Sequence, residues 1–149
     1  MLDSYNGTPI VISAFMHTGK AQCAHQWSDA CIYISGEGMN EDEFIAEVKK
    51  HLEECLYKYI LVPSNDDARK ALKEADIGYL IVAPITFSKD DYIRRALLES
   101  DRSIEHIKWL DDNWNYLIGR IKMDDAPKIW LNENETISDI LFGNLVRRV

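Results

Sequence analysis

The chain has 149 residues, of which 46% are hydrophobic and 28% charged, so we expect one soluble globular domain spanning residues 1–149. Its net charge of −8 disfavours direct binding to nucleic acid, which depends on lysine and arginine side chains that neutralise phosphates. The apolar stretches are too short to span a membrane, and residues 1–9 lack the features of a signal peptide, so we expect a cytoplasmic protein.

Cysteine and histidine spacing gives no sign of a metal centre. Cys23, Cys31 and Cys55 form no C-x-x-C pair, and without a secretory signal we expect them to be reduced thiols. The four histidines show no ligand spacing with these cysteines, so we expect no zinc site.

Five short, apolar and often β-branched runs predict buried strands. They cover residues 9–15, 30–35, 59–62, 78–83 and 128–131. Apolar residues at helical spacing predict helices over residues 21–27, 41–56, 66–75, 88–97, 104–121 and 137–145. Strands that alternate with helices indicate right-handed βαβ units, so we expect an α/β three-layer sandwich with a five-stranded, mostly parallel sheet.

Two helix starts carry the pattern of a capping box. Asn40 is followed by Glu43, and Ser88 is followed by Asp91, which is the spacing at which two side chains reciprocally cap the first turn. In the helix over residues 41–56 we expect four apolar side chains to face the sheet: Phe44, Ile45, Val48 and Leu52.

The segment over residues 36–56 is strongly acidic, with seven carboxylates against two lysines. One interpretation is a solvated helix face that keeps the protein soluble. The other is a protein-binding surface that docks on a basic partner. The residues expected to form that surface are Glu41, Asp42, Glu43 and Glu47.

The loop after the first strand carries the motif that points to chemistry. Residues 14–21 read AFMHTGKA, in which Gly19-Lys20 match the centre of the phosphate-binding pattern G-x-x-x-x-G-K-[S/T] and both flanks do not. Ligands of open parallel sheets bind at the carboxyl ends of the strands, which is where this loop is expected. Thr18, Gly19 and Lys20 are therefore candidate phosphate-binding residues.

Residues 9–21, PIVISAFMHTGKA, resemble the opening of P-loop nucleotide and nucleoside kinases, especially small kinase-like proteins encoded by bacteriophages. The resemblance continues in order through three later segments, over residues 59–72, 79–95 and 104–118. It implies that the first strand is central in the sheet. It also implies that lid-helix arginines could meet phosphates, and these are Arg94, Arg95 and Arg102.

Several departures from the kinase pattern bear on catalysis. His17 stands where these kinases keep a glycine, and Ala21 stands where they keep a magnesium-coordinating serine or threonine. The second strand leads into residues 33–38 without the Asp/Ser-rich segment of the phage relatives, and the third ends at residues 62–64 without a carboxylate. Glu99 lies among the lid arginines. One interpretation of His17 is a catalytic base, and the other, which we favour, is a steric blocker of an abandoned site.

Three functions stay open. We favour a catalytically degenerate, kinase-like protein without a cofactor, which acts as a phage-type acidic inhibitor by binding a host nucleic-acid-handling or defence enzyme. The second is a working nucleotide or nucleoside kinase that uses ATP or GTP with magnesium, Lys20 and the lid arginines. The third is a non-catalytic nucleotide-binding sensor. Lys20 fits a surface lysine at a helix start equally well, and the arginines fit a solvated helix face.

Overall fold

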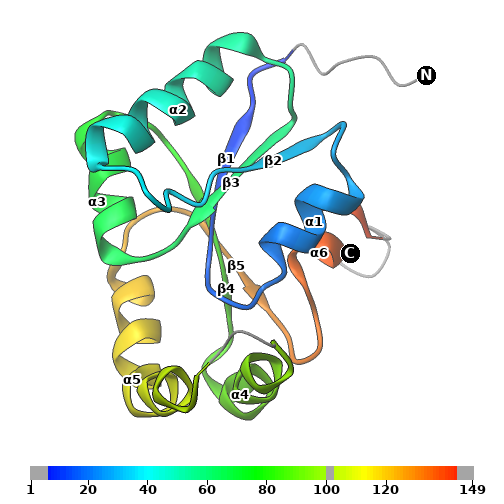
Figure 1. Cartoon of the computed structure of the whole chain (residues 1–149), viewed down its shortest axis with the longest axis vertical. Coiled ribbons are helices and arrows are strands. Elements are labelled where there is room, and N and C mark those ends of the chain that lie inside the picture. Colours follow the sequence, from blue (N-terminus) through cyan, green and yellow to red (C-terminus); the bar gives the residue numbers. More distant parts are fainter. Residues whose placement is uncertain (1–6, 100–102, 144–149) are drawn as a thin grey trace.

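The fold is a parallel sheet with helices on both faces (Figure 1). It is seen in a computed structural model that describes residues 7–99 and 103–143. The strands are β1 (Ile10–Ala14), β2 (Cys31–Tyr33), β3 (Tyr59–Pro63), β4 (Leu80–Pro84) and β5 (Lys128–Leu131). All pairings are parallel and the strand order is β2-β3-β1-β4-β5, so β1 is central, as the resemblance implied.

The helices divide between the two faces of the sheet. They are α1 (Lys20–Gln26), α2 (Glu41–Glu54), α3 (Asp66–Glu74), the short 3-10 helix η1 (Thr86–Ser88), α4 (Lys89–Leu98), α5 (Ile104–Met123) and α6 (Ile137–Phe142). Helices α1 and α6 lie side by side on one face, and α2, α3, α4 and α5 cover the other (Figure 1). The predicted three-layer α/β architecture is confirmed.

Each face of the sheet has its own apolar core, which is why the strands read as continuous apolar runs. Beneath α4 and α5, Phe15 meets Tyr92 and Trp114 edge-on, with ring centroids 6.0 and 5.7 Å apart. Beneath α1 and α6, Ile12 and Ile137 are fully buried. Because β1 contributes to both cores, the loop that follows it is held from both sides.

The helix starts confirm one predicted capping box and contradict the other. At α2 the Glu43 N–H donates to Asn40 Oδ1 at 2.8 Å, and the Asn40 N–H donates to Glu43 Oε1 at 3.0 Å. At α4, Ser88 belongs to η1 with φ −90° and ψ 13°, and it makes no side-chain cap. A capping residue needs an extended backbone, which Ser88 lacks, and the Asp91 carboxylate binds arginines instead.

Phe44 and Val48 are buried against the sheet as predicted, whereas Ile45 and Leu52 are only partly buried. All three cysteines are free thiols. The predicted residue Arg102 and the last two positions of the helix predicted over residues 137–145 lie outside the described residues. Among the described helices, none has the length and hydropathy needed to span a membrane.

Asp124, at the end of α5, joins three elements. Its Oδ2 accepts from the Tyr79 hydroxyl at 2.8 Å and lies 3.0 Å from Lys73 Nζ. Burial raises the pKa of Asp124, but hydrogen bonds from the Ala126 N–H, Tyr79 and Lys73 outweigh it and hold the pKa below its usual value. The carboxylate therefore fastens α5 to α3 and to the start of β4.

Candidate functional site

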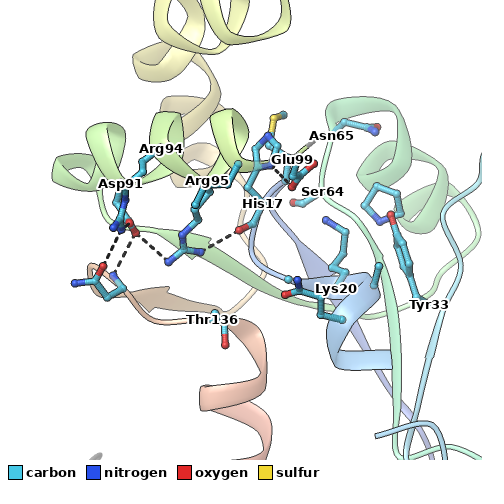
Figure 2. Close-up of a pocket in the computed structure, with 17 residues that line it drawn as sticks. His17, Lys20, Tyr33, Ser64, Asn65, Asp91, Arg94, Arg95, Glu99 and Thr136 are labelled. Carbon is cyan, nitrogen blue, oxygen red and sulfur yellow. Dashed lines mark hydrogen bonds and ion pairs between the residues drawn. The ribbon is translucent and has the colours of Figure 1, made fainter. Parts of the chain in front are cut away.

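A cavity of about 750 Å³ opens at the carboxyl ends of β1, β2 and β3. Figure 2 shows that its wall is built from the β1–α1 loop (residues 15–19), from α1, from α4 and from the turn before α6. This is the edge of the sheet at which the sequence predicted the ligand site. Gly19, Lys20, Arg94 and Arg95 all line the cavity, so the structure brings together four of the residues that the sequence predicted to meet phosphates.

Two left-handed residues shape the β1–α1 loop. His17 has φ 64° and Gly19 has φ 93°. Glycine adopts this conformation without penalty, whereas for other residues it costs about 1–2 kcal/mol. The loop thus bends at His17 as a glycine would allow, although the residue there carries a large ring.

Thr18 stabilises the loop from within and does not line the cavity. Its hydroxyl donates to the Phe15 carbonyl at 2.7 Å, and the residue is fully buried. Its carbonyl accepts the Ile137 N–H at 2.9 Å, which ties the loop to the start of α6. The Thr18 side chain therefore points into the protein and away from the cavity.

Lys20 is buried, with 9% of its surface exposed, which contradicts the interpretation as a surface lysine. Its Nζ donates to the carbonyls of Ala14 and Phe15 at 2.9 and 3.1 Å. The ammonium group also lies 5.8 Å from the centre of the Tyr33 ring. Lys20 also lines the cavity, so it adds a positive charge to the cavity wall.

Arg95 clamps the loop to the turn before α6 (Figure 2). Its Nη1 donates to the His17 carbonyl at 2.9 Å, and its Nη2 donates to the Glu135 carbonyl at 2.7 Å. Nη2 also lies 2.9 Å from Asp91 Oδ2. Only 15% of this side chain is exposed, so Arg95 does not belong to a solvated face. Arg94, by contrast, is 61% exposed at the cavity rim.

Asp91 supplies the counter-charge to both arginines. Burial raises the pKa of this carboxyl, but hydrogen bonds from Arg94 and the Asn134 N–H, together with the Arg95 charge, hold the pKa below its usual value. The cavity is therefore lined by three cations, Lys20, Arg94 and Arg95, and by two carboxylates, Asp91 and Glu99. The formal excess of one positive charge favours an anionic ligand.

The His17 ring is packed into the cavity wall, with 1% of its side chain exposed. Its Nδ1 lies 2.7 Å from Glu99 Oε1, and its Nε2 lies 3.0 Å from His106 Nε2. These partners are 82 and 89 residues away in sequence, so no local pattern could have paired them with His17. These two contacts are the feature of the cavity wall that the sequence did not predict.

The acidic residues of α2 lie apart from this cavity and differ from one another. Glu41 and Asp42 are exposed. Glu43 completes the capping box, and Glu47 lies 3.4 Å from His51 and 3.7 Å from Lys50. Glu41 and Asp42 thus differ from Glu43 and Glu47 in having no described side-chain partner, and they lie in the first turn of α2, where negative charge favours the helix.

Comparison of the sequence with protein-family models and with curated proteins found no match. Within residues 7–99 and 103–143, no group of three or more histidine, cysteine or acidic side chains is arranged to hold a metal ion.

Proposed function

We propose that this chain is a P-loop kinase-like domain that binds a phosphorylated, nucleotide-sized ligand as a sensor and does not transfer its phosphate. The observation that carries the proposal is the His17 ring, which is fixed by Glu99 in the turn where the kinases it resembles keep glycine. Lys20 and the cavity are nevertheless retained.

The cavity supports the binding half of the proposal. Its volume of about 750 Å³ lies within the usual range for small-molecule sites, roughly 300–1,000 Å³. Its cations come from α1 and α4, and polar side chains such as Asn65 and Thr136 stand around them (Figure 2). This lining suits a ligand with both an anionic group and hydrogen-bonding groups.

The residues of the β1–α1 loop support the second half of the proposal, that the chain does not transfer phosphate. Phosphoryl transfer relies on a metal ion that neutralises charge on the phosphates, and P-loops hold that ion partly through a hydroxyl directly after the lysine. Ala21 offers no hydroxyl at that position. Glu99 adds a negative charge to the wall of the cavity, which further disfavours a highly charged transition state.

Calorimetric titration with ATP and with GTP, each with and without magnesium, tests the proposal. We expect binding that magnesium does not strengthen and that Lys20→Met abolishes, with no ADP or GDP formed. Lys70→Met is the matched control, because Lys70 is exposed on α3 and does not line the cavity.

Two results would contradict the sensor. Magnesium-dependent binding with steady phosphoryl transfer, lost in Lys20→Ala, would favour a working kinase. Absence of nucleotide binding under all conditions would leave binding to another protein as the remaining role.

A second candidate is the acidic inhibitor suggested by the resemblance to phage proteins. It is favoured by the exposed carboxylates Glu41 and Asp42 on α2, because surface charges of one sign steer association with a basic partner. In a pull-down, a host nucleic-acid-handling or defence enzyme that binds the immobilised wild-type protein should not bind the double variant Glu41→Lys/Asp42→Lys. Raised salt should weaken its binding to the wild type. Binding of the enzyme that neither the double variant nor raised salt weakens would contradict this candidate.

A further inference from the structure

The outer face of α5 carries exposed apolar side chains at regular intervals. Trp109, Tyr116 and Met123 follow one another every seven residues, about two helical turns, and therefore lie on one face of the helix. Their exposed fractions are 43%, 61% and 77%. We refer to these three residues as the apolar stripe. The buried residues of α5 lie on the other side of the helix and face the core: Leu110, Trp114, Ile118 and Ile121. Apolar side chains gathered on one exposed face are typical of an interaction surface.

α5 lies at the edge of the molecule, so a second molecule can reach this face (Figure 1). The 3-10 helix η1 lies beside α5, because Trp114 Nε1 donates to the Thr86 carbonyl at 2.8 Å and Lys122 Nζ donates to Thr86 Oγ1 at 2.9 Å. Phe87 of η1 is almost fully exposed and adds apolar surface close to α5. The exposed apolar surface on this side of the protein is therefore wider than the helix itself.

Gly119 lies on this outer face between Tyr116 and Met123. In the interior of a helix, glycine is less favourable than alanine because it loses more backbone freedom on folding. Apart from its own helical backbone, a Cβ atom at Gly119 would meet no atom of the described chain within 4 Å, so packing within the chain does not explain the glycine. Glycine is also the residue that allows another chain to approach closely. Gly119 therefore indicates a close neighbour on the outer face of α5.

The charges of α5 are divided between its two halves. Residues 104–113 contain three carboxylates and one lysine, and residues 114–123 contain one arginine, one lysine and no carboxylate. Lys89 pairs with Asp111 and Asp66 pairs with Arg120, which reduces both charges but leaves the first half negative and the second half positive. Two such helices that pack antiparallel bring opposite charges together, whereas a parallel pair would bring like charges together.

We propose that the outer face of α5 is the interface of a homodimer, in which α5 packs antiparallel on α5 of a second copy of the chain. A two-fold axis then passes near the middle of both helices, and one surface serves both copies. The Trp109 ring of each copy meets the half of the other helix that holds Gly119 and Met123, where the glycine leaves room for it. Opposite charges meet along the same contact.

This inference goes beyond the proposed function and does not depend on it. Within the described chain, no residue that lines the cavity belongs to α5, so the dimer leaves the ligand site of each copy accessible. A helix of 20 residues is about 30 Å long, and a pair of such helices is small for a stable interface. We therefore expect a dissociation constant of about 1–100 µM. Sedimentation velocity of the full chain from about 1 to about 300 µM covers this range.

Two double variants test the pairing of opposite charges. Glu105→Lys/Asp112→Lys makes both halves of α5 positive, and Arg120→Glu/Lys122→Glu makes both halves negative. Each variant alone should dimerise at least tenfold more weakly than the wild type. An equimolar mixture of the two should form a heterodimer, because each half of one helix then again meets a half of opposite charge.

Glu53→Lys/Glu74→Lys is the matched control for charge. It makes the same change in net charge at exposed residues of α2 and α3, and it should dimerise as the wild type does. Gly119→Gln separates the helix from the interface. Glutamine favours the helix, so the monomer at low concentration should unfold at a higher temperature, whereas the longer side chain should weaken dimerisation at least tenfold. A role confined to the helix would not produce these opposite changes.

Three results would overturn the dimer. The first is a wild type that stays monomeric at all concentrations. The second is a dimer that neither double variant nor Tyr116→Glu weakens, because its interface would then lie elsewhere. The third is a pair of monomeric double variants that form no heterodimer when mixed. Circular dichroism establishes that each variant is folded, and Tyr116→Glu decides the question if a double variant does not fold. Binding of ATP by a monomeric wild type would leave the sensor standing.

Discussion

Replacing His17 by glycine and Ala21 by serine restores two features of a phosphate-binding loop in one variant. Glycine fits the left-handed turn at residue 17, where φ is 64°, and removes the ring from the wall of the cavity. Serine returns a hydroxyl directly after Lys20, where a magnesium ion bound to a nucleotide could use it. If these two departures silence the loop, the double variant should bind magnesium–ATP better than the wild type does.

The stability cost of the variant follows from opposing contributions at residue 17. Relief of the left-handed backbone gains about 1 kcal/mol. Loss of the contacts to Glu99 and His106 costs about 0.5–1.5 kcal/mol each, and the greater freedom of glycine in the unfolded chain costs about 0.5–1 kcal/mol. The net loss is about 0.5–3 kcal/mol, and each kcal/mol lowers the unfolding temperature of a chain of this length by about 2–4 °C.

The affinity for magnesium–ATP should rise about tenfold. This corresponds to about 1.4 kcal/mol of binding free energy, which the added metal ligand and the removal of the His17 ring would supply together. Calorimetry measures the affinity for ATP with and without magnesium, and thermal unfolding measures the cost in stability. Ala46→Ser is the control for added hydroxyls, because Ala46 is exposed on α2 and does not line the cavity. A folded double variant whose magnesium–ATP affinity equals that of the wild type would refute the reasoning about this loop.

The α2 capping box, the Tyr79–Asp124 hydrogen bond and the charge on Asp124 give three further predictions. Glu43→Ala should cost about 0.5–1 kcal/mol in urea unfolding because it removes one hydrogen bond of the capping box, whereas Glu41→Ala on the same helix should cost less than half of that; equal losses would contradict the assignment. Tyr79→Phe should cost about 1–2 kcal/mol in urea unfolding, because it removes the hydroxyl that donates to Asp124 at 2.8 Å, and an unchanged midpoint would show that water replaces it. The pKa of Asp124 is lowered in the folded protein, so its stabilisation is present above the unfolded value of about 3.9 and is lost as the pH falls through the folded value. Asp124→Asn should therefore be less stable near neutral pH and should lose less further stability on acidification, which unfolding curves at several pH values measure.

Local patterns were sufficient to predict the elements of this fold. The strand over Lys128–Leu131 is observed with the predicted ends, and α2 begins at the predicted capping box of Asn40 and Glu43. Apolar runs and capping residues act over a few neighbouring positions, so they can be read without knowing the rest of the chain. The same holds for Gly19-Lys20, whose place after a strand and before a helix is a local property. The predicted cap at Ser88 is wrong because η1 fixes the backbone of that residue, which the spacing of Ser88 and Asp91 alone does not reveal.

The tertiary structure decided what these residues do. Lys20 is buried because β1 lies between β3 and β4 and places the loop at the base of the cavity. Arg95 is a clamp because the turn before α6 lies within reach of α4. His17 meets Glu99 and His106 only because α4 and α5 pack over the carboxyl end of β1, which joins segments 82 and 89 residues apart. Pairings between groups so distant in sequence depend on how whole elements pack, and no local pattern carries that information.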